Sequence, residues 1–267
     1  VWLDGLERDD ALELVRRFAD ASVTSGALSD EKLAELAAAA QYNPQAMKLA
    51  VSLVQSGSAE HDDVVRTLDS TTTGSDTGAA LASVFEQSWN SLSQGARDLV
   101  LVASSFDGVP SIRRPALQHA SGLSEPAFDE ALSAVVERCL LEASAGERYA
   151  VHSRTRELVR ALPVDRGDLI SEAQERCARY YLDYLRSTIV RSGGREPGPQ
   201  YWNALVSPAM TKIDDDWPMI RKQLEWARKN DLELLYDFVM LLIHYMDSRF
   251  YNLDRLTYAG AVADHLS

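Results

Sequence analysis

The sequence predicts a mainly α-helical protein made of several small modules. Its 267 residues are rich in Ala, Leu, Glu, Asp and Arg, whereas Gly and Pro number only 14 and 9, and this favours helices over the many turns of an all-β protein. Apolar residues also recur at spacings of three and four along most of the chain, which is the period of amphipathic helices. A chain of this length forms one large domain or two to three small ones.

The first module is predicted over residues 1–56, as a small helical bundle. Apolar residues repeat at helical spacing from Ala11 to Phe18, after two Asp residues suited to a helix start. Ser29 is a candidate N-cap for a second helix, and Asn43-Pro44 marks the start of a third, because Pro is tolerated in the first turn. Residues 57–79 are rich in Ser, Thr, Gly and Asp, and they predict a linker with one brief helix.

A second module is predicted over residues 80–163. Helical periodicity marks four segments, at 81–92, 96–105, 112–120 and 128–140. Two short apolar runs then flank a Gly-containing turn at 144–147, as in a β-hairpin. Helices followed by a hairpin describe a winged-helix domain.

Residues 164–267 are predicted to form a C-terminal helical region. A long helix carries apolar and aromatic residues at helical spacing from Ile170 to Tyr184, and a Gly- and Pro-rich run at 193–199 interrupts the pattern. Two more helices follow at 217–227 and 235–246, separated by the turn Asn230-Asp231. Helical hairpins of this kind resemble a TPR-like solenoid.

Charge and cysteine content exclude several classes of function. The formal net charge of −13 argues against nucleic acid as a partner, because the affinity for nucleic acid comes mostly from Lys and Arg.

Cys139 and Cys177 lie far apart in the sequence, and no further Cys or His stands near them at the spacing of zinc ligands. We therefore predict neither a metal site nor a disulfide, but two small buried residues in a reducing cytoplasm. The apolar run Phe238–Met246 is shorter than the roughly 18 to 20 residues of a membrane span, so we expect a soluble, cytoplasmic protein without a membrane partner. Because the chain opens on Val1 rather than Met, we expect a further segment before it.

Three segments resemble those of one protein family. Residues 3–18 look like the leucine and amphipathic helix that open the family's small helical domain. Residues 42–50 are similar to a Gly-Leu-Pro-Leu-Ala motif, in which Pro44, Ala46 and Leu49 fit. Residues 149–153 resemble a Met-His-Asp motif at the end of a winged helix, with His152 retained. With the order of the modules, these segments resemble the regulatory half of NB-ARC, or STAND, signal-transduction ATPases.

The resemblance implies a regulatory fragment of a nucleotide-switched protein. It places Pro44 against the adenine and His152 against the β-phosphate of ADP, so that ADP or ATP binds in the full-length parent but not tightly to this chain. It also implies an upstream nucleotide-binding domain as a partner, a homo-oligomer on activation, and a protein or small-molecule signal at the C-terminal helices. The sequence has no Gly-x-x-x-x-Gly-Lys-Ser/Thr segment and no apolar strand ending in paired acids, so we expect no catalytic residues and no enzymatic activity in this chain.

Other interpretations of the same residues stay open. Locally, Pro44 equally fits an ordinary helix start, His152 fits a buried histidine bonded to a backbone carbonyl, and Ser153 is a candidate N-cap for the helix that follows. The run 214–216 consists of three Asp residues without the spacing of a calcium loop, so we expect the acidic first turn of a helix rather than a metal site.

A DNA-binding alternative rests on five arginines of the second module. They are Arg113, Arg114, Arg154, Arg156 and Arg160. Together they could form the basic patch of a winged helix, although Arg154 and Arg156 do not share a helix face and nearby Glu residues dilute the positive charge. The alternative function is therefore a DNA-binding winged-helix fragment of a bacterial-type transcriptional regulator.

Overall fold

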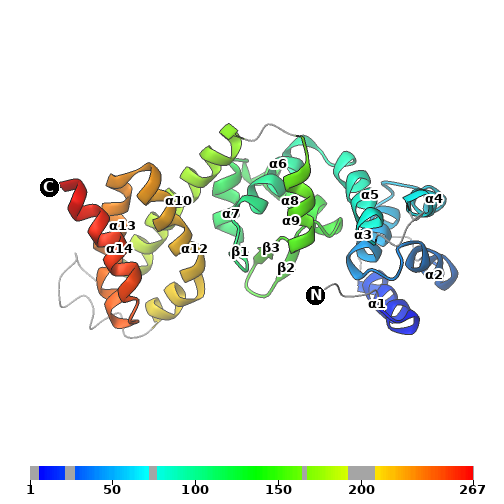
Figure 1. Cartoon of the computed structure of the whole chain (residues 1–267), viewed down its shortest axis with the longest axis horizontal. Helices are drawn as coiled ribbons and strands as arrows, with labels where there is room; N and C mark the ends of the chain where they lie inside the picture. The colour runs from blue at the N-terminus through cyan, green and yellow to red at the C-terminus, as the bar shows by residue number, and fades with distance from the viewer. Residues whose placement is uncertain (1–5, 22–27, 72–76, 164–166, 192–207, 267) are drawn as a thin grey trace. The chain divides into compact units, whose positions relative to one another are not determined.

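The structure is a computed structural model that describes residues 6–21, 28–71, 77–163, 167–191 and 208–266, and it confirms a mainly α-helical fold (Figure 1). Residues 3–5, which begin the first of the three resembling segments, and the Gly- and Pro-rich run 193–199 lie outside the described residues. The chain forms two compact units. The first contains Val1–Ser104, Ser124–Ala145 and Tyr149–Val164, and the second contains Ser105–Leu123, Gly146–Arg148 and Asp165–Ser267. The domain boundaries expected near residues 56, 79 and 163 stay predictions.

A helical bundle opens the first unit. It consists of α1 (Arg8–Ala21), α2 (Asp30–Ala39), α3 (Pro44–Gln55), α4 (His61–Thr71) and α5 (Thr77–Asn90). The predicted cap at Ser29 and the predicted helix start at Asn43-Pro44 are both confirmed. The Ser29 hydroxyl accepts the Lys32 N–H at 3.4 Å, and the Asn43 side-chain oxygen accepts the N–H groups of Gln45 and Ala46 at 3.1 and 3.0 Å.

Helix α4 lies within the range predicted as a linker. Val64 and Leu68 are both 0% exposed, because their four-residue spacing places them on one helix face, which packs toward α2 and α5. His61, at the start of α4, is also buried, and its Nε2 lies 3.2 Å from the carbonyl oxygen of Lys32. The brief helix expected there is thus a packed part of the first unit.

The elements that follow α5 have the order of a winged helix. They are α6 (Gln94–Ser105), β1 (Ile112–Arg113), α7 (Arg114–Ser121), α8 (Glu125–Glu137), β2 (Glu142–Ser144), β3 (Arg148–Ala150) and α9 (Ser153–Ala161). The strands form one sheet in the order β1-β3-β2. The predicted hairpin is confirmed, and its turn uses the left-handed backbone region at Gly146 (φ 76°) and Glu147 (φ 53°). The helix predicted from 112 starts instead at Arg114, because Ile112 and Arg113 pair as a strand and Pro115 fits only a first turn.

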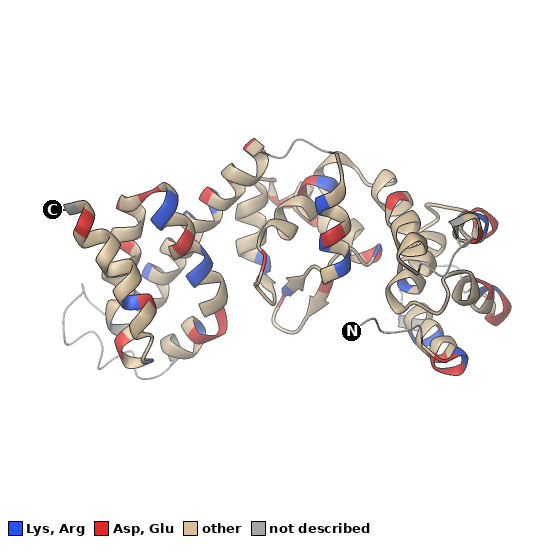
Figure 2. Ribbon diagram, viewed as in Figure 1, with Lys and Arg blue, Asp and Glu red and all other residues tan. Residues whose placement is uncertain are grey.

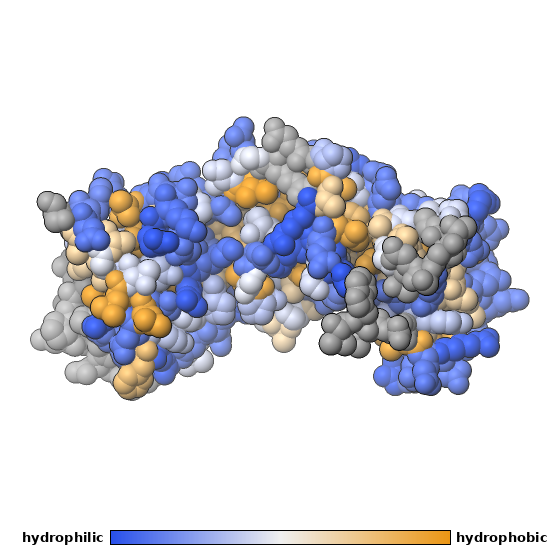
Figure 3. Space-filling model, in the orientation of Figure 1, coloured by the Kyte–Doolittle hydropathy of each residue, from blue (hydrophilic) through white to orange (hydrophobic). Residues whose placement is uncertain are grey.

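The C-terminal helices of the second unit pack in sequence order. They are α10 (Gly167–Arg191), α12 (Pro208–Asn230), α13 (Leu232–Ser248) and α14 (Asn252–Leu266), and α7 packs on α10. Helix α12 runs through Asp214–Asp216, so the helix start expected at these acids was wrong. Figure 3 shows a hydrophobic patch over the N-terminal part of α14, where Leu253 and Leu256 are 81% and 64% exposed, and Phe250, just before this helix, is 83% exposed. Within the described ranges, no helix has both the length and the apolar character that a membrane crossing requires.

Candidate functional site

His152 lies at the start of helix α9, where it acts as the N-cap. Its Nδ1 accepts the backbone N–H of Arg154 at 3.3 Å. The cap was expected at Ser153, but Ser153 is already the first helical residue. The alternative, a backbone carbonyl as the partner of His152, is not seen either, because the imidazole bonds to a backbone N–H group. His152 therefore has a local structural role in beginning α9.

Pro44 occupies the first turn of α3 and is exposed to solvent. The preceding Asn43 caps the helix, as an ordinary Asn-Pro start does. The next residue, Gln45, is buried, and its side-chain amide donates to the carbonyl oxygen of Cys139 at 3.4 Å. The interactions described around both Pro44 and His152 are thus those of helix starts.

Helix α8 has a strongly acidic exposed face. It is the third helix in the winged-helix order, and in helix-turn-helix proteins the corresponding recognition helix enters the major groove. Its exposed side chains include Glu125, Asp129, Glu130 and Glu137, and its sequence contains no Lys or Arg. This face repels phosphate rather than attracting it.

Helix α9 carries the opposite balance of charge. Arg154 and Arg160 are exposed and Arg156 is half-buried, and they outnumber the single acid of this helix, Glu157 (Figure 2). Arg154 forms an ion pair with Glu157 at 2.8 Å. Of the basic residues that the sequence singled out, those on α9 are the ones that keep an outward, net positive surface.

Arg113 belongs to a different arrangement, a buried ionic cluster in the second unit. The Asp216 side chain is 0% exposed, and its two oxygens lie 2.5 Å from Arg113 Nε and 2.5 Å from Arg148 Nη2. The Arg113 guanidinium also lies 5.3 Å from the ring centroid of Tyr184. Burial, together with the negative charge of Asp216, raises the pKa of Tyr184 to about 12. The cluster joins strands β1 and β3 to helices α10 and α12, and Arg113 is not available as part of an exposed basic patch.

The spacing of apolar residues around Asp216 is a sequence signal for its burial. Ile213, Trp217 and Ile220 are buried on α12 at helical spacing, and Asp216 lies on the same face. Asp214 has other partners, because it accepts from the Tyr245 hydroxyl at 2.6 Å and from Arg249 Nε at 2.9 Å. The acids therefore do not converge on one point, and within the part of the chain that the structure describes no group of His, Cys, Asp or Glu could hold a metal ion.

Comparison with known proteins changes the functional interpretation. No model of a known protein family matches the chain. The chain is 24% identical, over 245 residues, to the protein named transcription activator GutR of Bacillus subtilis (strain 168). The match covers 89% of this chain but only 28% of that protein, so the chain spans about a quarter of the length of this relative.

This finding overturns the resemblance to NB-ARC or STAND ATPases. The match is to a transcription activator, and nothing in it supports an ATPase fragment, an upstream ATPase domain or ADP binding. The ADP contacts suggested for Pro44 and His152 rested on that resemblance alone and are not carried further. The expectation that nucleic acid is an unlikely partner was also wrong, because it took the net charge of the whole chain as a measure of every surface.

Proposed function

We propose that the chain is part of a transcriptional regulator and has a regulatory, non-catalytic role in it. The observation that carries this proposal is the 24% identity to a transcription activator over 89% of the chain. The fold is in keeping with it, since the element order includes that of a winged helix. We place the protein in the cytoplasm, in keeping with action on bacterial-type transcription.

The test uses the full-length protein in its own cells. Chromatin immunoprecipitation is combined with transcript profiling after deletion of its gene. The expected result is occupancy at a limited set of sites and altered transcript levels of the adjacent genes. Absence of enriched sites, together with unchanged transcripts under conditions in which the protein is made, would overturn the proposal.

A second candidate function is direct contact of this chain with duplex DNA. The winged-helix order favours it, and the charges favour α9 over α8 as the contacting helix, because α8 has only acidic charges. Each Lys or Arg that neutralises a phosphate steepens the slope of the logarithm of the binding constant against the logarithm of the salt concentration by about 0.9. The two exposed arginines of α9, Arg154 and Arg160, would therefore contribute about two units of this slope.

The second candidate is tested by fluorescence anisotropy with a labelled duplex, at several salt concentrations. The double variant Arg154→Ala/Arg160→Ala is expected to lower the salt slope by about two. Glu130→Gln, on the acidic face of α8, serves as the control and leaves the slope unchanged. Salt-independent binding, or an equal slope in the double variant, would exclude α9 as the contact.

A further inference from the structure

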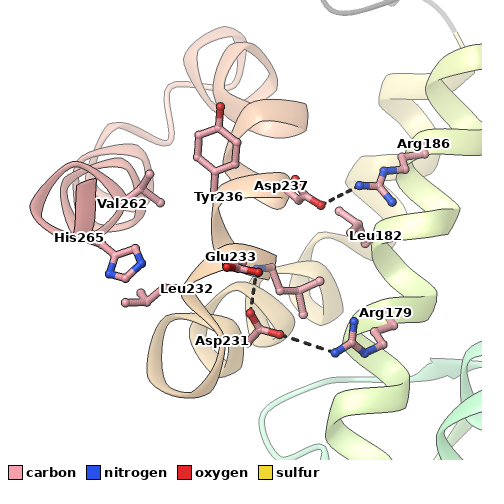
Figure 4. A pocket seen from close by; sticks show the side chains of 11 residues that line it. Arg179, Leu182, Arg186, Asp231, Leu232, Glu233, Tyr236, Asp237, Val262 and His265 are labelled. Carbon is pink, nitrogen blue, oxygen red and sulfur yellow. Dashed lines mark hydrogen bonds and ion pairs between the residues drawn. The ribbon is translucent and has the colours of Figure 1, made fainter. Parts of the chain in front are cut away.

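Helices α10, α13 and α14 of the second unit enclose an open pocket of about 590 Å³. This volume lies in the range of small-molecule sites, roughly 300 to 1,000 Å³. Figure 4 shows Glu233 near the centre of the lining, with Arg179 and Arg186 of α10 to one side and Val262 and His265 of α14 to the other. The pocket thus has a charged side toward α10 and a more apolar side toward α14.

On the charged side, each arginine already has acidic partners within the protein. Arg186 forms an ion pair with Asp237 at 2.7 Å, and the nearest carboxylate oxygen of Asp231 lies 3.7 Å from Arg179. An anionic ligand would have to displace these carboxylates, and it would then face them. The two arginines therefore form ion pairs between α10 and α13 and are poorly suited to bind an anionic ligand.

Glu233 is the acidic residue of the pocket lining that takes no part in these ion pairs. It is exposed, it lies in the first turn of α13, and among the described residues its side chain forms no hydrogen bond or ion pair. The N-terminus of a helix carries about half a positive charge, which the capping Asp231 alone can offset. The centre of the pocket, where Figure 4 shows Glu233, consequently keeps one carboxylate outside the ion pairs between α10 and α13.

The groups around Glu233 suit the rest of an organic cation. Tyr236, one turn later on the same helix, is 42% exposed and lines the pocket, and in Figure 4 its side chain extends away from Glu233. Leu232 and Val262 supply apolar surface for a short hydrocarbon chain. We propose that this pocket binds a small primary amine, with its ammonium group at Glu233 and its hydrocarbon part on Leu232 and Val262. The proposal concerns binding by this chain and holds or fails independently of the role in transcription.

The experiment uses hexylamine as the probe, with hexan-1-ol and hexanoate as probes of equal chain length and different charge. Binding is followed by amide chemical shifts of the full chain in NMR titrations. The expected result is saturable shifts at 232–237 and in α14 with hexylamine, and much weaker shifts with the other two probes. Equal responses to all three probes, or shifts confined to other parts of the chain, would overturn the proposal.

Two variants assign the cation contact. Glu233→Gln is expected to raise the dissociation constant of hexylamine about tenfold or more, because a charge-assisted contact is lost. Tyr236→Leu replaces a lining side chain that extends away from Glu233 and is expected to leave the constant nearly unchanged. Glu130→Gln removes one negative charge from α8 and likewise leaves the constant unchanged. Circular dichroism checks that each variant is folded, and wild-type affinity in the folded Glu233→Gln variant contradicts the proposal.

Discussion

Replacing Asp216 by Asn tests whether the buried ionic cluster stabilises the second unit. The substitution keeps the volume of the side chain and removes its charge, which leaves two guanidinium groups without their anion. Losing one partner of a buried pair costs about 3 to 5 kcal/mol. The side chains of Arg113 and Arg148 are 27% and 17% exposed, so water reaches them partly, and we take the lower end, about 3 kcal/mol.

Urea unfolding measures this loss. With a slope of about 2 kcal/mol per molar urea, the midpoint of the transition is expected to fall by about 1.5 M. Asp215→Asn is the matched control, because this neighbouring side chain is exposed and its substitution should change stability by no more than about 0.5 kcal/mol. A triple variant that replaces Asp216 by Leu and both arginines by Met should recover most of the loss, since an apolar cluster has no charge to desolvate. A midpoint for Asp216→Asn within about 0.3 M of the wild-type value would refute the reasoning.

Three further predictions concern the thiols, a helix cap and a buried hydroxyl. Burial raises the pKa of the Cys139 thiol to about 12 and also raises the pKa of the fully buried Cys177 thiol, so both thiols stay neutral at pH 8. They should react with Ellman's reagent only after the protein is unfolded in urea, and rapid reaction of the folded protein would contradict this. Asn43→Ala removes two capping hydrogen bonds and should lower the free energy of unfolding, measured in urea, by about 1 kcal/mol. An unchanged midpoint of the transition would show that the cap does not stabilise the protein. Tyr245→Phe removes the 2.6 Å hydrogen bond to Asp214 and should cost about 1.5 to 3 kcal/mol, whereas a gain in stability would show that this bond is dispensable.

Local features were predictable from the sequence because they depend on neighbouring residues. The cap at Asn43 and the hairpin turn at Gly146 each follow from the residue types within a few positions. The same reasoning misplaced the cap of α9 by one residue, since it preferred a hydroxyl at Ser153 to the imidazole of His152. Boundaries of this kind are decided by small differences between adjacent candidates.

The role of Asp216 was not predictable by the same means. Three consecutive acids before a Trp-Pro pair look like a helix start, although Ile213 already belongs to the helical spacing that Trp217 and Ile220 continue, and α12 includes all three acids. The partners of Asp216 lie on two strands distant in sequence, and only the fold brings them to it. The pocket beside α13 was likewise hidden, because its lining comes from three helices whose packing the sequence does not state.

The buried cluster has a consequence for the rate at which the protein folds and unfolds. Arg148 is separated from Asp216 by 68 residues, so the contact closes a long loop and can form only after the intervening helices are largely in place. Interactions that form after the transition state affect the unfolding rate far more than the folding rate. The ionic cluster should therefore leave the folding rate almost unchanged. It should lower the unfolding rate, and so lengthen the lifetime of the native state, once the Asp216 carboxylate is paired with both arginines.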